Sequence, residues 1–451
     1  MEKNELFLAF YGDDFTGSTD AMEALAKSGF RTVLFLEAPS PALLDRFEGL
    51  RCIGVAGTSR AKKPAGMEDE LRPVMKQLAK SGAKVVHYKT CSTFDSSPEI
   101  GSIGKAIEVS RDYFPDQTVV PLLVGAPALG RFTVFGNHFA RMQDTVYRLD
   151  RHPVMARHPI TPMGESDLRL HLKEQLQEDI ALMDILELEG DYDTVQGRYQ
   201  QKTGVTLFDA LDEERIGRSG RLIWETAGEG PEFVVGSSGV EYALTAHWEQ
   251  AGIAATTTSA SKPNVAAADR ILAVSGSCSP VSQQQIEIAI QQGFYGMKIP
   301  VEQIVNADSV PKEFLEEAVS RLQEGQSVIV YSALGPDDES IVATREHFAR
   351  MGKEEYDSGE FIGRQLGRWT KYIMQEAGIS RVVIAGGDTS GFVTSEMGIY
   401  GLEMLLPVSP GAPLCKVYSE DSRMDGMELA LKGGQFGSPD YFIKVKDASS
   451  N

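Results

Sequence analysis

Two adjacent carboxylates follow the first apolar run of the chain. Residues 6–11 have the pattern of a buried strand, and the turn behind them, residues 12–20, contains Asp13, Asp14 and Asp20. A carboxylate at a strand end could accept the proton of a substrate hydroxyl, or hold magnesium directly or through water. A helix cap would account for one aspartate only. We therefore predict a functional acidic turn in which Asp13 or Asp14 is the catalytic base.

Other polar groups near this turn are suited to bind substrate oxygens. Thr16 and Gly17 lie within the acidic turn itself. Thr161 follows a proline-rich loop that holds two histidines, and we expect it to border the same pocket. The spacing of histidines and carboxylates leaves the metal ligands unassigned.

Three basic residues lie just beyond other predicted strands, and they suggest an anionic substrate. They are Arg60, Lys89 and Arg131. The carboxyl ends of parallel strands share one edge of a sheet, so these cations should lie on the same edge as the acidic turn. Arginine grips a carboxylate through two parallel hydrogen bonds, whereas lysine acts as a point charge. A small substrate that carries a carboxylate is the natural inference.

The alternation of short apolar runs with amphipathic segments predicts two α/β domains, each with a mainly parallel sheet flanked by helices. The first spans 1–255 and binds the substrate; the second spans 265–451; the small polar stretch 254–264 is the predicted linker. We expect the active site in the cleft between them, a common place for a small ligand. The predicted strands are 6–11, 32–36, 52–56, 84–88, 119–124, 233–235, 271–275, 327–331 and 382–385, and the predicted helices are 18–28, 166–177, 281–292 and 361–377.

Glycine-rich turns in the second half of the chain are suited to bind phosphate. Residues 386–391 follow an apolar strand and open a helix, residues 276–280 repeat this design, and residues 432–437 form a third cluster. Glycine lets the backbone approach a ligand closely, and free amides at a helix N-terminus favour phosphate oxygens. The alternative is that these turns are only helix caps. The G-x-x-x-x-G-K-[ST] pattern is absent, so any nucleotide site here is of another kind.

The composition narrows the classes of function. The net charge of −20 argues against a surface for nucleic acid or anionic membrane, because such surfaces need clustered Lys and Arg. The four cysteines are far apart, which favours a reducing, cytoplasmic setting. No signal peptide and no apolar run of membrane-spanning length is found. The oligomeric state is open, with a homo-oligomer as one alternative.

Taken together, the motifs resemble those of the four-carbon acid sugar kinases. The resemblance covers nearly the whole chain and rests on long, uncommon segments. They are residues 11–20, 88–98, 158–163, 275–277, 386–391 and 432–437.

This resemblance implies an N-terminal substrate domain and a C-terminal nucleotide domain that uses ATP and Mg²⁺. It implies phosphorylation of a hydroxyl of a small sugar acid such as threonate, erythronate or a 3-oxo form. Residues 89–95 and 130–138 depart from the commoner family pattern, so the branched acid 3-oxo-isoapionate is a further candidate. The nucleotide contacts it implies are Ser275, Ser277, Gly386, Gly387, Asp388, Thr389, Ser390, Gly433 and Gly434.

Two other functions stay open at this point. A non-catalytic sugar-acid sensor would keep the basic pocket without needing the aspartates. A phosphatase or hydrolase would act on a phosphorylated acid without ATP, although the adjacent spacing of Asp13 and Asp14 does not match the alternate spacing of aspartyl-nucleophile phosphatases.

Overall fold

The chain folds into two compact units, Met1–Thr258 and Ser259–Asn451. The computed structural model describes residues 5–158, 160–228, 230–253, 265–301, 305, 312–351 and 355–450, with side chains undescribed at 355–358 and 388. The predicted linker 254–264 lies outside the described residues.

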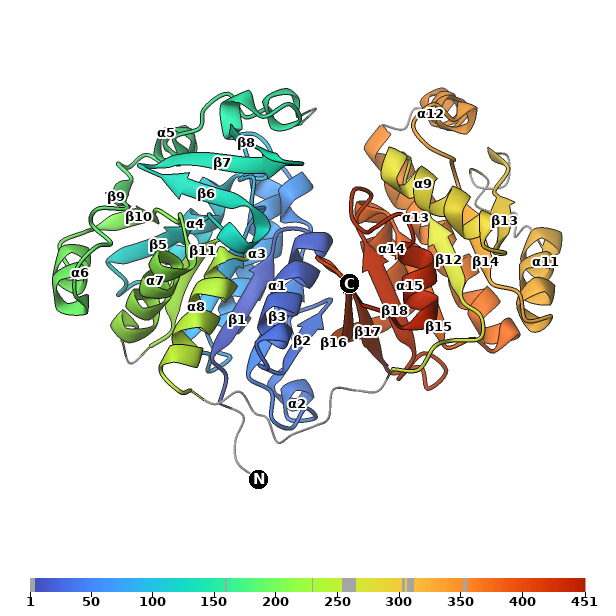
Figure 1. The fold of residues 1–451 in the computed structure, drawn as a ribbon, viewed down its shortest axis with the longest axis horizontal. Coiled ribbons are helices and arrows are strands. Elements are labelled where there is room, and N and C mark those ends of the chain that lie inside the picture. Colours follow the sequence, from blue (N-terminus) through green and yellow to red (C-terminus); the bar gives the residue numbers. More distant parts are fainter. Residues whose placement is uncertain are drawn as a thin grey trace. The chain divides into compact units, whose positions relative to one another are not determined.

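The first unit is built on a parallel sheet (Figure 1). Its strands are apolar and almost wholly buried, as expected for a sheet that is covered on both faces. In register, Gly12 at the end of the first strand lies beside Ala56 and Lys89, the last residues of its two neighbours. The spatial order is β2 (Thr32–Phe35), β3 (Cys52–Ala56), β1 (Leu8–Gly12), β4 (Val85–Lys89), β11 (Glu232–Gly236), β5 (Val119–Leu123), β10 (Gly204–Phe208) and β9 (Ala181–Met183).

The direction of each crossover explains which face its helix covers. The chain moves from β1 toward β2 in one direction, and from β3 past β1 to β4 in the other. Because such crossovers are right-handed, their helices lie on opposite faces of the sheet, and β1 is the point where the winding reverses. One face carries α1 (Phe15–Lys27), α7 (Glu213–Thr226) and α8 (Gly239–Gln250), and the other carries α3 (Pro64–Leu78) and α4 (Ile103–Arg111).

A small antiparallel sheet, which the sequence analysis did not predict, follows β5. It consists of β6 (Arg131–Val134), β7 (Asn137–Met142) and β8 (Thr145–Arg148). The tight turn between its first two strands places Phe135 and Gly136 at positive φ, 50° and 80°. The predicted helix 166–177 is shorter than expected, α5 (Leu168–Lys173).

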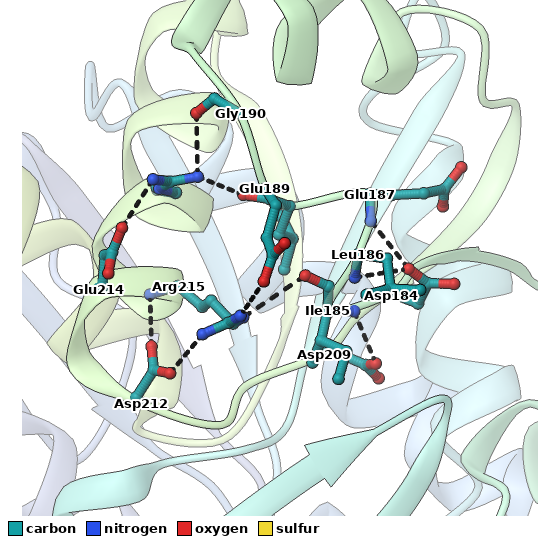
Figure 2. A network of polar contacts seen from close by, with 12 residues as sticks. Asp184, Ile185, Leu186, Glu187, Glu189, Gly190, Asp209, Asp212, Glu214 and Arg215 are labelled. Carbon is teal, nitrogen blue, oxygen red and sulfur yellow. Dashed lines mark hydrogen bonds and ion pairs between the residues drawn. The ribbon is translucent and has the colours of Figure 1, made fainter.

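A buried carboxylate fastens this small sheet to the main one. Asp209, just after β10, accepts hydrogen bonds from the backbone N–H groups of Phe135 and Gly136, and from Ile185 at 3.1 Å. Burial raises the pKa of Asp209 to about 6, although these three donors oppose the shift. Figure 2 shows Asp209 beside the segment 184–190, which Arg215 ties to the start of α7. A cavity of about 260 Å³ near Arg215 and Arg218 is lined by charges that already pair with one another.

The second unit has a mixed sheet. Its order is β13 (Tyr295–Lys298), β14 (Val328–Tyr331), β12 (Leu272–Ser275), β15 (Arg381–Ala385), β18 (Glu428–Lys432), β17 (Ala412–Ser419) and β16 (Ile399–Ser409). The strands from β13 to β18 pair in parallel, whereas β17 is antiparallel to both of its neighbours. The mainly parallel arrangement, with β12, β14 and β15, agrees with the sequence prediction, whereas β13, β18 and the long antiparallel pair were not predicted.

Helices cover both faces of this second sheet. One group of helices consists of α9 (Pro280–Gln291) and α15 (Tyr441–Asp447), which contact each other. The other group is centred on α13 (Glu355–Ala377), which packs on α11 (Lys312–Gln323), α12 (Glu339–Arg350) and α14 (Gly387–Glu396). Apolar side chains of β12, β14, β15 and α9 form the core, among them Ala273, Ile286 and Ile329. Among the described helices, none combines the length and the apolar character that a membrane crossing requires.

Candidate active site

The acidic turn is anchored by its backbone at the carboxyl edge of the first sheet. The Asp13 N–H donates to the Lys89 carbonyl at 2.9 Å, and the Asp13 carbonyl accepts from the Arg60 N–H at 3.0 Å. The register of β1 with β3 and β4 therefore brings three predicted residues to one place. Asp13 and Arg60 follow β1 and β3, and Lys89 is the last residue of β4, so all three lie at the sheet edge that the sequence analysis expected.

Arg60 holds both aspartates of the acidic turn. Its guanidinium donates to Asp13 Oδ2 at 3.2 Å and to Asp13 Oδ1 and Asp14 Oδ1 at 2.7 Å each. Burial raises the pKa of Asp13, and the Arg60 charge opposes this rise. Arg60 was predicted as a ligand of the substrate carboxylate, but its charge is already shared by two protein carboxylates.

The two aspartates differ in accessibility. The Asp13 side chain is 2% exposed and both of its oxygens are bonded to Arg60. The Asp14 side chain is 28% exposed. Asp14 Oδ1 also caps α1 by accepting from the Gly17 N–H at 2.9 Å, whereas Asp14 Oδ2 has no donor among the described residues. Asp14 is therefore the carboxylate that a ligand can reach.

Lys89 lies across the first turn of α1. It is 3% exposed, and a side chain at position 17 would collide with its ammonium group and with Asp14 Oδ1. A side chain at position 17 would therefore displace the Lys89 ammonium or the Asp14 carboxylate from its present position. Burial raises the pKa of the nearby Asp20, and the Lys89 charge opposes this rise. Thr16 is partly buried, and its carbonyl accepts a hydrogen bond from Thr19 Oγ1.

Arg131, the first residue of β6, is a cation without a carboxylate partner among the described residues. Its Nη1 donates to the carbonyls of Leu129 at 3.1 Å and Arg141 at 3.3 Å, and its buried Nε has no partner within the described part of the chain. Burial lowers the pKa of Arg131, while the charges of Asp95 and Asp20 oppose this shift. Arg131 therefore lies near the acidic turn with donors to spare.

Residues of the loop after β4 complete this surrounding; the sequence analysis singled out the segment 89–95 but gave a role only to Lys89 within it. Thr93 Oγ1 donates to Asp95 Oδ1 at 2.8 Å and is hydrogen-bonded to Cys91 Sγ at 3.0 Å. Burial raises the pKa of Cys91 to about 11, and the Asp95 charge adds to this rise. Their position directly behind Lys89 was the available signal. Thr161 is buried and bonded to His158 in its own loop, and its predicted role as a substrate contact stays a prediction.

In the second unit, the glycine turns follow neighbouring parallel strands and meet. The Gly276 N–H donates to the Ala385 carbonyl at 3.0 Å, and the Gly386 N–H donates to the Lys432 carbonyl at 2.9 Å. These bonds join the ends of β12, β15 and β18. The predicted turn 386–391 is shorter than expected, because α14 already begins at Gly387.

The glycines let these three turns pack closely against one another, and we call this cluster of turns the glycine cradle. Gly386 has φ 140°, and a Cβ there would lie 2.7 Å from Thr389 Oγ1. A Cβ at Gly434 would lie 2.7 Å from Ser277 Oγ, and one at Gly276 would collide with Thr389. This packing brings the N-termini of α9 and α14, with their free amides, to the same place. The arrangement fits the phosphates of a nucleotide.

The remaining predicted nucleotide contacts surround the cradle. Ser275 ends β12 and is fully buried, and its Oγ accepts from the Ser277 N–H at 3.4 Å. Ser390 Oγ donates to the Gly386 carbonyl at 2.6 Å, which uses that hydroxyl inside α14. Gly387 and Thr389 lie in the first turn of α14, and Gly433 follows β18. The side chain of Asp388 lies outside the described residues.

No group of three or more His, Cys, Asp or Glu side chains that could hold a metal ion occurs among the residues the structure describes. Sequence reasoning named Lys432 only as the first residue of the cluster 432–437 and did not mention Ser282; these two residues are hydrogen-bonded beneath the glycine cradle. The position of Lys432 directly before Gly433 was the signal that could have found it.

Both units match known domain families. Residues 8–244 match the model of a sugar-binding N-terminal domain, and residues 272–442 match that of a nucleotide-binding C-terminal domain. The acidic turn and Arg131 fall within the first match, and the glycine cradle falls within the second.

Relatives similar to the whole chain have kinase names. A Paraburkholderia graminis protein named 3-oxo-isoapionate kinase is 45% identical over 450 residues, which cover 98% of this chain and 94% of that protein. A Pseudomonas savastanoi protein named 3-oxo-tetronate kinase is 27% identical, with 97% of this chain and 96% of that protein covered. A Salmonella typhimurium protein of the same name is 28% identical, with 98% and 99% covered.

Solved structures share the fold. One, described as a putative tRNA synthase from Salmonella typhimurium, has a TM-score of 0.76 at 24% identity and covers 98% of this chain and 99% of its own. A Haemophilus influenzae protein has a TM-score of 0.73 at 22% identity and covers 97% and 99%. At these identities the likeness concerns the fold alone.

Proposed function

Since the chain belongs to the four-carbon acid sugar kinase family, we propose that it transfers the γ-phosphoryl group of ATP to a hydroxyl of a small sugar acid. The observation that carries this proposal is that the same unit holds an accessible aspartate, Asp14, and an arginine with unused hydrogen-bond donors, Arg131. Asp14 supplies a base for a hydroxyl, and Arg131 supplies a cation for a carboxylate. A hydroxy acid carries both groups.

The reaction requires little covalent chemistry from the protein. The substrate hydroxyl oxygen forms a bond to the γ-phosphorus, the bond from that phosphorus to the bridging oxygen breaks, and ADP leaves. Asp14 Oδ2 accepts the hydroxyl proton, while Asp13 and Arg60 hold the Asp14 carboxylate in place. Positioning and charge stabilisation supply most of the rate in such transfers. The expectation of a cleft between the domains stays a prediction.

Three cations of the first unit have different roles in this proposal. Arg60 organises the aspartates, because its donors already face Asp13 and Asp14. Arg131 binds the substrate carboxylate through Nε and its free Nη donors. Lys89, buried beside Gly17, offers a point charge to oxygens over the first turn of α1. Of the three cations that the sequence analysis suggested for the substrate carboxylate, this proposal assigns that role to Arg131.

Mg²⁺ completes the proposed site. In phosphoryl-transfer sites this ion is held by nucleotide phosphates, waters and one or two carboxylates. Because Asp14 Oδ2 is the base in this proposal, the nucleotide phosphates and waters would hold the ion, which would neutralise phosphate charge when bound. Ser277 and the turns at Gly386 and Gly434 would hold the phosphates of ATP.

The preferred acid is 3-oxo-isoapionate in this proposal. It is the acid named in the 45% identical relative, whereas the relatives named for 3-oxo-tetronate are 27% and 28% identical. The segment 89–95, which departs from the commoner family pattern, contains the hydrogen-bonded side chains of Cys91, Thr93 and Asp95. In this proposal these side chains select the substrate.

The first experiment measures ADP release with ATP and Mg²⁺ against both threonates, both erythronates, their 3-oxo forms and 3-oxo-isoapionate. We expect the strongest response with 3-oxo-isoapionate, and a return to background when EDTA removes the metal, because the phosphate charge is then no longer neutralised. Added Mg²⁺ should restore the rate. A protein that does not bind ATP would instead be the sensor, and release of phosphate from a phosphorylated acid without ATP would identify the hydrolase.

Arg131→Met is expected to raise the KM of the acid about 10- to 150-fold, since a hydrogen bond to a charged group contributes about 1.5–3 kcal/mol. The KM of ATP should stay unchanged. Steady-state kinetics with each substrate varied in turn would measure this. Arg148→Met is the matched control, because Arg148 lies on the same small sheet but is 45% exposed and pairs with Asp150. An unchanged KM of the acid in Arg131→Met would assign the carboxylate to another cation.

A further inference from the structure

Lys432 is a buried cation beneath the glycine cradle. It ends β18, directly before Gly433, and it is 1% exposed. Its ammonium donates to Ser282 Oγ at 3.0 Å, and no carboxylate of the described residues forms an ion pair with it. Burial alone lowers the pKa of Lys432 to about 8. A charge that is buried with so little compensation disfavours folding, so a role other than stability must account for it.

A chain of hydroxyl groups leads from this ammonium to the cradle. Ser282 Oγ lies 3.0 Å from Ser277 Oγ and 3.2 Å from the Gly434 carbonyl, and it has a single proton to give to one of them. Ser277 Oγ also accepts from the Ser279 N–H at 3.3 Å. When Ser282 donates to Ser277, both acceptor positions of Ser277 are used. The proton of the Ser277 hydroxyl is then left for a ligand in the cradle.

We propose that Lys432 is a positioning residue for the nucleotide, which acts through Ser282 to direct the Ser277 hydroxyl proton toward a phosphate oxygen. This inference rests on the proposed use of ATP. The ammonium sets the direction of the hydrogen-bond chain, because it can only donate, and hydrogen bonds in such a chain strengthen one another. Its charge also favours an anion at the end of β18, where free backbone amides already gather.

Lys432→Met tests this proposal. Methionine keeps the length and removes the charge, so the Kd of ATP should rise about 10- to 150-fold, as expected for one charge-assisted hydrogen bond. The Kd of adenosine, which has no phosphates, should change less than about twofold. The melting temperature without ligand should stay the same or rise, since an uncompensated buried charge is replaced by an apolar group. Calorimetric titration and thermal unfolding give these values.

Two further variants separate the hydroxyl chain from a general charge effect. Ser282→Ala should weaken ATP binding as well, and the Lys432→Met/Ser282→Ala protein should bind ATP no more weakly than Lys432→Met alone, because both changes break one chain. Lys416→Met is the control, since Lys416 lies on β17 of the same sheet, near Tyr418. It should bind ATP like the unmodified protein.

The outcomes distinguish this inference from the proposed function. If the unmodified protein does not bind ATP, the proposed function fails. If it binds ATP and Lys432→Met binds ATP equally well, only the role of Lys432 is overturned. A lower melting temperature together with equal losses for ATP and adenosine would also overturn it, by showing a purely structural role.

Discussion

Asp14→Asn is expected to lower kcat about 10²- to 10⁴-fold, the usual contribution of a general base. An amide cannot accept the hydroxyl proton, whereas its oxygen can still accept from the Gly17 N–H and from Arg60, as Asp14 Oδ1 does. Asparagine is also a good helix N-cap, so α1 should keep its start. The melting temperature and the Kd of ATP should therefore stay close to those of the unmodified protein.

Steady-state kinetics with the preferred acid, alongside thermal unfolding, would measure this effect. Asp13→Asn is the informative comparison, because both Asp13 oxygens accept from Arg60 and the new amide would turn a donor toward that guanidinium. Asp13→Asn should thus lower stability. It should also lower activity indirectly, because a displaced Arg60 would no longer hold the Asp14 carboxylate in place. If Asp14→Asn kept its kcat while a folded Asp13→Asn lost it, the roles of the two aspartates would be reversed.

Arg60→Met is expected to cost about 3–5 kcal/mol of unfolding free energy at pH 7, the range for removing one partner of a buried ion pair. The change leaves the Asp13 carboxylate, 2% exposed, without its counter-ion. Chemical denaturation would measure the loss. Arg72→Met is the control, because Arg72 is 42% exposed and pairs with an exposed Asp112, so its loss should be about 0–1 kcal/mol.

The cost of Arg60→Met should depend on pH. Burial already raises the pKa of Asp13, and without the Arg60 charge, which opposes this rise, that pKa moves further up. A raised carboxyl pKa in the folded state favours the protonated form, so its stabilising effect is present at low pH and is lost as pH rises through the folded pKa. The variant should therefore lose less stability near pH 5 than near pH 8. Adding Asp13→Asn should recover part of the loss at pH 8, and an equal loss at both values would argue against the buried charge as the cause.

The strand ends that carry the chemistry could be predicted from the sequence. Apolar runs bounded by polar turns identified β1, β3, β4 and β5 within one or two residues of their observed bounds. Parallel sheets need such continuous apolar strands because both faces are buried, which makes them recognisable without a structure. The acidic turn follows β1, Lys89 ends β4, and the glycine turns 276–280 and 386–391 follow β12 and β15, so these sheet edges were predictable as well. β18, which precedes the third glycine cluster, was not predicted.

The antiparallel elements could not be predicted in the same way. β6, β7 and β8 are short and half exposed, and β16 has an irregular pattern of burial. Their stability comes from partners elsewhere, such as Asp209, which lies 74 residues beyond Phe135 in the chain and holds the turn at Phe135 and Gly136. A local pattern carries no information about such a distant acceptor.

The residue types and their order thus determined the central apolar strands, such as β1, β4, β12 and β15, and the charged or glycine-rich residues at their carboxyl ends. Only the tertiary structure decided how those charges are shared. In the folded protein Arg60 forms ion pairs with Asp13 and Asp14, Arg131 keeps unused hydrogen-bond donors, and the Lys432 ammonium donates to Ser282 Oγ. The reason is physical. A cation interacts most strongly with a carboxylate that lies within a few ångströms of it, and that distance is set by the packing of strands that are far apart in the sequence.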